Sequence, residues 1–191
     1  MDLLNPTTTG HKLQDDPTWG IDIKGISKVQ VYSFNEAVEV LERGESNRSY
    51  RKKDNHERSS RSHTVFRLYL QSNNMELSKA KLVRRFSLLN LVDLAGSERL
   101  NDSKYDNAAE TGSINKSLFL LSNVISRLAE GDSQHIPYRD SKLTRLLENS
   151  LGGNSCTLVV CCVSPALVNF QETVSTLRFG LRAKKVENQK R

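Results

Sequence analysis

The hydrophobic pattern is clearest at residues 86–92, a nearly continuous apolar run that ends at Asp93. An apolar run of this length that ends in an acid predicts a strand buried on both faces. A second such strand is predicted over residues 156–163, closed by Ser164 and Pro165. Two buried strands within one chain favour an α/β fold with a central sheet.

Upstream of the first run, residues 64–71 alternate between apolar and polar side chains, which predicts a strand. Residues 72–76 read as a turn, and residues 81–92 as the return strand. The resulting long hairpin would place Thr64 close to Asp93. Shorter strands are predicted at the edge of a sheet over residues 20–23 and 29–32.

Helical spacing of apolar residues appears in four places. The first helix begins at Ser33, forms a capping box with Glu36 and ends at Gly44. In the last, Phe170, Val174, Leu177 and Leu181 are expected to face the core. The predicted helices are residues 33–44, 114–131, 140–151 with Asp140 as N-cap, and 169–184 with Asn169 and Glu172 as a cap pair.

Composition indicates one globular domain of 191 residues, with 37% hydrophobic and 26% charged side chains. The net charge of +6 favours an acidic partner. Charge alone does not choose among nucleic acid, an anionic membrane and an acidic protein. Nucleic acid is disfavoured because no basic surface with interleaved aromatic residues is visible. Cys156, Cys161 and Cys162 are predicted to be buried, reduced thiols, and no signal peptide or membrane-spanning run is expected.

Candidate chemistry begins where the first apolar run ends. Asp93 would follow a buried strand, at the position where α/β sheets bind ligands, and could hold a Mg²⁺ shell. Gly96 would let the backbone N–H approach a phosphate because it has no Cβ. A lone D-x-x-G pattern is more often an ordinary turn, so further motifs are needed to support this assignment.

Those motifs are present in one order along the whole chain. They are SSRSH at residues 59–63, LVDLAGSE at 91–98, INKSL at 114–118, HIPYRDSKLTRLLENSLGGNS at 135–155 and ETVSTLRFGLRAKKVEN at 172–188. In sequence and order they resemble the motor domain of kinesins. The resemblance assigns residues 1–188 to the carboxyl-terminal part of that domain and residues 189–191 to the start of the neck linker.

The resemblance implies a P-loop NTPase-like α/β fold, with a central mixed β-sheet and helices on both faces. It makes SSRSH switch I and DLAGSE switch II. Ser59 and Ser60 would reach the γ-phosphate and Mg²⁺, Asp93 would bond a Mg²⁺-bound water, and Gly96 would sense the γ-phosphate. Arg61 would pair with Glu98 when both switches close. The implied cofactors are ATP and Mg²⁺.

The resemblance also implies a microtubule-binding face on residues 115–130 and 140–151. Arg139, Lys142 and Arg145 would there attract acidic tubulin. The implied partners are microtubules or a kinesin partner chain, with no nucleic acid and no membrane. The implied location is the cytoplasm and the microtubule cytoskeleton.

One feature of the family is missing from these 191 residues: no G-x-x-x-x-G-K-[ST] sequence occurs. Without it, a chain lacks the N–H nest and the Lys that hold the β- and γ-phosphates. We therefore expect very weak nucleotide binding and no ATPase activity from this chain alone. Two functions stay open: part of a microtubule-stimulated ATPase motor, or a nucleotide-free kinesin-like module that binds microtubules or a partner.

Overall fold

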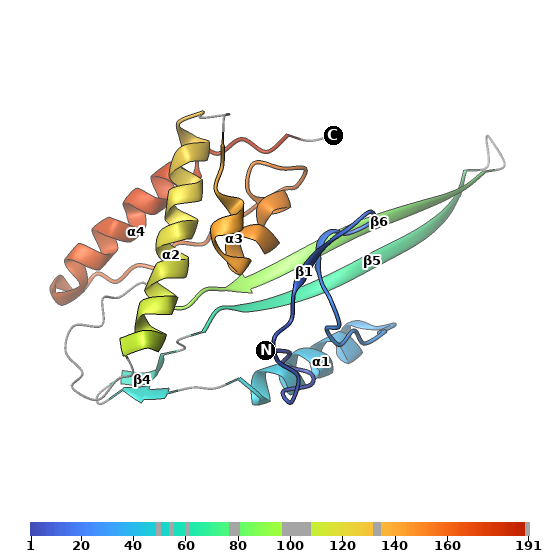
Figure 1. Cartoon of the computed structure of the whole chain (residues 1–191), viewed down its shortest axis with the longest axis horizontal. Helices are drawn as coiled ribbons and strands as arrows, with labels where there is room; N and C mark the ends of the chain where they lie inside the picture. Colours follow the sequence, from blue (N-terminus) through green and yellow to red (C-terminus); the bar gives the residue numbers. More distant parts are fainter. Residues whose placement is uncertain are drawn as a thin grey trace. The chain divides into compact units, whose positions relative to one another are not determined.

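The structure is a computed structural model, and it describes residues 1–48, 51–53, 56–59, 62–76, 81–96, 108–131 and 135–189. The chain divides into two compact units, residues 1–96 and 97–191. Figure 1 shows the helices and strands coloured in chain order.

A long antiparallel hairpin dominates the first unit. Strand β5 (Thr64–Glu76) pairs along its whole length with β6 (Lys81–Asp93), and the register places Thr64 opposite Asp93 (Figure 1). The hairpin and its register confirm the prediction. The predicted turn at residues 72–76 is wrong, because β5 continues through this segment to Glu76.

Strand β6 is less buried than its sequence predicts. Phe86, Leu89 and Leu91 are 44–50% exposed, so burial on both faces is a wrong prediction. In the part of the chain that the structure describes, β6 has only β5 as a hydrogen-bonded neighbour. A continuously apolar strand is typical of the middle of a sheet, with a neighbouring strand on each side, and among the described strands β6 has such a neighbour on one side only.

Two shorter hairpins belong to the same unit. Strands β1 (Leu13–Asp16) and β2 (Gly20–Ile23) pair with each other, and β3 (Arg51–Lys53) pairs with β4 (His56–Ser59). Strand β2 confirms the prediction for residues 20–23. Residues 29–32 were expected to form another strand, but no strand is assigned there.

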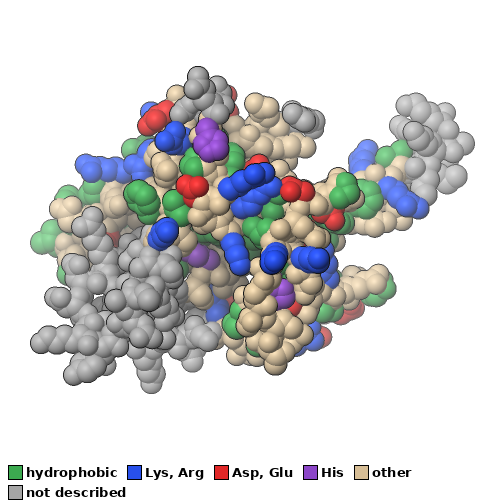
Figure 2. All heavy atoms as spheres, viewed as in Figure 1, with side chains coloured by type: hydrophobic (Ala, Val, Ile, Leu, Met, Phe, Trp, Pro, Cys, Tyr) green, Lys and Arg blue, Asp and Glu red, His purple; other side chains and the backbone are tan. Residues whose placement is uncertain are grey.

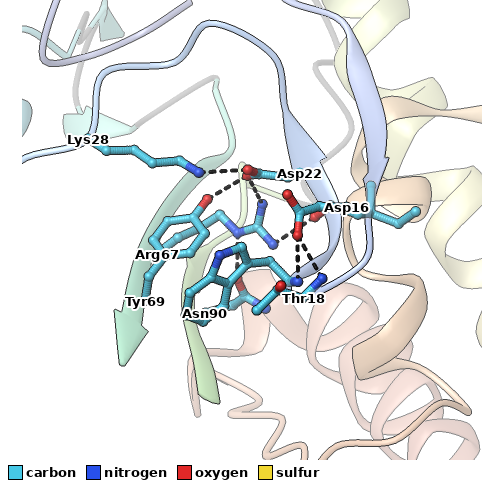
Figure 3. Close-up of polar contacts among 9 residues, drawn as sticks. Asp16, Thr18, Asp22, Lys28, Arg67, Tyr69 and Asn90 are labelled. Carbon is cyan, nitrogen blue, oxygen red and sulfur yellow. Dashed lines mark hydrogen bonds and ion pairs between the residues drawn. The ribbon is translucent and has the colours of Figure 1, made fainter. Parts of the chain in front are cut away.

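A buried polar cluster joins β2 to the long hairpin, as Figure 3 shows. The Asp22 carboxylate accepts hydrogen bonds from Lys28 Nζ (2.6 Å), Tyr69 OH (2.6 Å) and Arg67 Nη1 (3.3 Å). Arg67 also donates to Asn90 Oδ1 (3.0 Å) and to the Ile21 carbonyl (2.9 Å). The side chains of Asp22 and Arg67 are only 4% and 7% exposed. These five contacts form the Asp22 cluster.

Trp19 packs against aromatic side chains of the long hairpin. Its ring meets Tyr69 and Phe86 edge to face, with centroid distances of 5.1 and 5.5 Å. Such geometry suits the quadrupoles of aromatic rings. Trp19 is therefore a packing residue.

Helix α1 (Phe34–Ser46) begins where its capping residues predict. Ser33 accepts a hydrogen bond from the Glu36 N–H, and Glu36 in turn accepts from the Ser33 hydroxyl and from the Tyr32 N–H. The helix does not end at Gly44 but continues to Ser46. Gly44 is buried, and a Cβ built on it would lie 3.8 Å from Leu3, so this glycine serves close packing against the first residues.

The second unit is helical. Helix α2 (Ala108–Ala129) begins earlier than predicted and precedes Gly131, whose φ of +72° suits a helix end. Leu121, Val124 and Ile125 form its buried face. Helix α4 (Phe170–Ala183) follows the short helix η3 (Leu167–Asn169) and lies against α2, where Arg182 donates to Ser122 Oγ (3.3 Å).

The predicted helix over residues 140–151 is three short elements. They are η1 (Tyr138–Asp140), α3 (Lys142–Leu146) and η2 (Glu148–Ser150). The N-cap of α3 is Ser141, not Asp140, because Ser141 and Thr144 satisfy each other's backbone N–H groups in a full capping box. Asn169 likewise makes no side-chain cap at α4; its amide donates to Ser164 Oγ instead (3.2 Å).

Residues 156–163 contradict the prediction of a buried strand. No strand is assigned there among the described residues, and Leu158 and Val160 are 87% and 77% exposed. Cys156 and Cys162 are exposed free thiols and Cys161 is half-buried, so their predicted burial is wrong. The apolar stripe of α4 is also uncovered, since Phe170, Leu177 and Leu181 are 50–65% exposed.

Figure 2 shows Lys and Arg side chains next to acidic and hydrophobic ones on the described surface. Among the described residues, no helix combines the length and the apolar character needed to cross a bilayer.

Candidate functional site

The two predicted switch loops are connected by the long hairpin. Thr64, which follows the SSRSH sequence, begins β5, and its register partner Asp93 ends β6. Because antiparallel strands bring opposite ends together, residues 62–64 and 93–96 lie at one end of the hairpin. The expected proximity of the two motifs is therefore present in the described residues.

Arg48 holds these two loop ends together. Its guanidinium donates to Asp93 Oδ2 (2.6 Å) and to the Ser62 carbonyl (3.0 Å), and it also contacts Glu45 Oε1 (3.4 Å). The Arg48 side chain is only 5% exposed, whereas that of Asp93 is 66% exposed. A planar guanidinium has several donors in fixed directions, so one buried Arg can bridge two loops.

His63 provides a second link between the loops. Its Nδ1 accepts a hydrogen bond from the Ala95 N–H (3.0 Å), and Ala95 is buried. Burial lowers the pKa of His63, and the nearby Asp93 carboxylate opposes that effect only in part. A neutral imidazole that accepts at Nδ1 carries its proton at Nε2, so this contact requires the neutral ring.

The predicted site residues fall into two groups. Ser60, Arg61 and Glu98 lie outside the described residues, and Ser59 is placed only as the last residue of β4. Asp93 and Gly96 are described, and both are exposed at the end of β6 and just after it. The structure thus brings Asp93 and Gly96 to the same exposed edge as the end of the SSRSH sequence.

The described residues at this edge supply only some of the ligands that a Mg²⁺ ion needs. Asp93 presents a mostly exposed carboxylate, and the described residues contain no group of three or more His, Cys, Asp or Glu that could hold a metal. Mg²⁺ is often held by one or two carboxylates together with waters and substrate phosphates. Among the described residues the site offers one mostly exposed carboxylate, which suits an ion whose other ligands are waters and phosphate oxygens.

The three predicted microtubule-contact residues differ in availability. Arg139 and Lys142 are exposed, at η1 and at the start of α3. Arg145 is 18% exposed, and its guanidinium pairs with Glu148 (2.5 Å). Arg139 and Lys142 are thus more exposed than Arg145, whose guanidinium pairs with Glu148.

Arg48 is the residue that sequence reasoning missed. The composition of residues 47–54 predicts a solvated basic loop that could attract phosphates or acidic protein. For Arg48 that prediction is wrong, because its side chain is only 5% exposed and pairs with Asp93. Nothing in the sequence separates Arg48 from the other cations of the run, because its contacts with Asp93 and Ser62 span 45 and 14 positions. His63 was visible within the SSRSH sequence, but its contact with Ala95 depends on the hairpin register.

Comparison with known proteins places these features in a family. A sequence profile of the kinesin motor domain matches residues 1–186. The kinesin heavy chains of Doryteuthis pealeii and Drosophila melanogaster are each 46% identical to this chain over 189 residues, which is 98% of it. Human kinesin heavy chain isoform 5C is 44% identical over the same length. The chain spans about a fifth (19%) of each of these relatives.

A solved structure shows the same fold. It is a KIF14 dimer in a two-heads-bound state, with AMP-PNP and in complex with a microtubule. The match has a TM-score of 0.87 at 39% sequence identity, and it covers 95% of this chain and 51% of the KIF14 chain. The α/β fold class is therefore that of a partial P-loop NTPase-like motor domain. The described strands form three separate two-stranded sheets, of which the β5–β6 hairpin is the longest. This chain belongs to the kinesin motor domain family.

Proposed function

We propose that this chain is the phosphate-sensing and microtubule-contacting part of an ATP-driven microtubule motor. The observation that carries the proposal is the junction of residues 62–64 with residues 93–96, held by Arg48 and His63. Two loop ends fixed to each other in this way can respond together to one ligand, because a shift of either loop disturbs shared contacts. The family of the chain supports the same assignment.

In this proposal each site residue has a separate task. Ser59 and Ser60 contact the γ-phosphate and Mg²⁺, Asp93 bonds a Mg²⁺-bound water, and Gly96 offers its N–H to the γ-phosphate. Arg61 and Glu98 form an ion pair when the loops close. Phosphoryl transfer depends mainly on such positioning and charge stabilisation.

In this proposal the nucleotide is bound mainly by another part of the motor domain, because the 191 residues contain no phosphate-loop sequence. Mg-ATP should accordingly raise the melting temperature of the 191-residue chain by less than about 1 °C, since weak binding gives little stabilisation. The measurement is a thermal melt with and without Mg-ATP, repeated with Asp93→Ala. A shift of several degrees in the wild-type chain that disappears in the variant would overturn this part of the proposal.

Microtubule binding is tested by co-sedimentation. Arg139→Ala and Lys142→Ala should each weaken binding, and binding should fall as salt rises because exposed charges are screened. Arg178→Ala is the matched control, since Arg178 is an exposed cation on α4 outside the proposed face. Equal loss in all three variants would point to unspecific charge attraction and contradict the proposed face.

A second candidate is a kinesin-like module that binds a partner without hydrolysis. The exposed apolar side chains of residues 156–163 and of α4 favour it, since large uncovered apolar patches mark interaction sites. ATP turnover distinguishes the candidates. If the chain joined to the remaining half of a kinesin motor domain still fails to hydrolyse ATP on microtubules, the second candidate replaces the first.

A further inference from the structure

Strand β6 carries one short sequence that the proposed function does not use. It is Arg84-Arg85-Phe86-Ser87, and two adjacent arginines occur nowhere else in the 191 residues. A serine with arginines two and three residues before it is the pattern that many basophilic protein kinases select. The selection is electrostatic, since carboxylates of the kinase pair with the two guanidinium groups. A sequence match alone is weak evidence, so the way the fold presents these residues has to support it.

The three side chains that a kinase would read are exposed. Arg84, Arg85 and Ser87 all lie at the surface of the chain. Within the described ranges, neither guanidinium has an ion-pair partner, and the Ser87 hydroxyl has no hydrogen-bond partner. The two arginines are therefore available to carboxylates of another protein, and the hydroxyl is available as a nucleophile.

The alternation of β6 turns Ser87 away from the packed side of the hairpin. Phe86 meets Trp19 edge to face, with a centroid distance of 5.5 Å, and neighbouring residues of a strand point to opposite faces. Ser87 and Arg85 therefore share the other face, and the register places Leu70 opposite Ser87. Leu70 is 51% exposed, so this face is uncovered around the hydroxyl.

The backbone of β6 also suits a kinase, because kinases bind the substrate segment as an extended chain. Strand β6 is extended, and in the part of the chain that the structure describes it pairs with β5 alone (Figure 1). Its other edge can therefore exchange backbone hydrogen bonds with another protein, as open sheet edges do. Residues 84–87 thus combine the required side chains with an accessible, extended backbone.

We propose that Ser87 is a phosphorylation site for a protein kinase that selects arginine two and three residues before its acceptor. In the reaction, Ser87 Oγ attacks the γ-phosphorus of ATP bound to the kinase, the bond from that phosphorus to its bridging oxygen breaks, and ADP leaves. The hydroxyl proton passes to the catalytic aspartate of the kinase. The product carries about two negative charges on the same face as Arg85, whose guanidinium can donate to the phosphate.

Phosphorylation of the folded 191-residue chain tests the site. The probe is the catalytic subunit of cAMP-dependent protein kinase with Mg-ATP, and mass spectrometry identifies the modified residue. We expect phosphate on Ser87. Arg84→Ala and Arg85→Ala should each slow this modification by about tenfold or more, since each loses charge-assisted hydrogen bonds to the kinase. A wild-type chain without phosphate on Ser87, or equal rates in the arginine variants, would overturn the proposal.

Ser72 is the matched control for accessibility. It is exposed and lies opposite Arg85 in register, so it shares a hairpin face with Ser87. Tyr69 and Leu70 occupy the positions three and two residues before it, where a kinase of this class needs arginines. Ser72 should accordingly be modified at least about tenfold more slowly than Ser87. Equal rates at the two serines would indicate unspecific modification and contradict the assignment.

A destabilised variant shows whether the kinase acts on the folded chain, because unfolding would also expose the serine. Asp22→Ala leaves the buried Arg67 without its carboxylate and so raises the unfolded fraction. If β6 itself presents Ser87, the initial rate of modification should stay within about twofold of the wild-type rate. A rate that rises in proportion to the unfolded fraction would show that only the unfolded chain is modified, and would overturn the proposal.

Discussion

The Asp22 cluster of the first unit and residues 156–163 of the second unit show opposite outcomes of folding. In the cluster, a carboxylate and a guanidinium that are less than 10% exposed find partners in residues of the same chain. In residues 156–163, apolar side chains suited to a buried strand stay up to 87% exposed, with no strand assigned. Side-chain polar groups can be satisfied by a few near neighbours, whereas an apolar strand needs whole strands beside it and layers above it.

The largest effect is expected from removing the centre of the cluster. Asp22→Ala leaves the buried Arg67 without its carboxylate, and breaking a buried ion pair costs about 3–5 kcal/mol. Urea unfolding measures the loss. Glu39→Ala, which removes an exposed acid from α1, should change the free energy of unfolding by less than about 0.5 kcal/mol. Similar losses in both variants would show that the cluster is no stronger than a surface charge.

Acid should weaken the same cluster. Burial alone would raise the pKa of Asp22, but hydrogen bonds from Lys28, Tyr69 and the Ile23 N–H outweigh burial and lower it. The stabilisation from a carboxylate with a lowered pKa is present above its unfolded pKa, near 4, and is lost as the pH falls through the folded value. Asp22→Ala should accordingly lose less stability than the wild-type chain when the pH is lowered below about 4.

Local signals in the sequence predicted much of the first unit. The Ser33 cap depends on residues three positions apart, and the β5–β6 register follows from two adjacent strands. Capping and hairpin pairing are short-range effects, so they can be predicted from a single sequence. The predicted N-cap of α3 was wrong, although capping is a short-range effect. Ser141 and Asp140 are both good caps, and the reciprocal contact of Ser141 with Thr144 decides between them.

Predictions failed where the outcome depends on distant residues. Arg48 looked like part of a solvated basic loop, because its contacts with Asp93 and Ser62 span 45 and 14 positions in sequence. Gly44 looked like a helix end, because its neighbour Leu3 lies far upstream. The strand at residues 156–163 was predicted from its apolar composition. Composition indicates that a segment can form a strand, but not whether neighbouring strands are present to pair with it.

A smaller effect is expected at the loop junction. Burial lowers the pKa of His63, so the unfolded chain binds a proton more readily than the folded chain does. Stability should then be full above the unfolded His pKa, near 6.5, and fall as the pH drops below it. Protonation would also remove the acceptor of the Ala95 N–H. The measurement is urea unfolding at pH 7.5 and 5.5.

His63→Gln provides the control for this pH dependence. Gln keeps a hydrogen-bond acceptor within reach of Ala95 but does not titrate in this range. Its stability should therefore change less between the two pH values than that of the wild-type chain. An unchanged pH dependence in His63→Gln would assign the effect to other groups and remove the junction from this explanation.

The smallest effect is expected in residues 156–163 themselves, and it tests the comparison most directly. Leu158→Ala removes a side chain that is 87% exposed, so the free energy of unfolding should change by less than about 0.5 kcal/mol. Leu121→Ala makes the same chemical change at a position that is 4% exposed in α2, and should cost about 2–5 kcal/mol. A large loss from Leu158→Ala would mean that this segment is covered in solution, and the contrast with the Asp22 cluster would disappear. A small loss would mean that these apolar residues contribute little to the stability of the chain by itself, so their hydrophobic character would have to be explained by contacts made in a larger assembly.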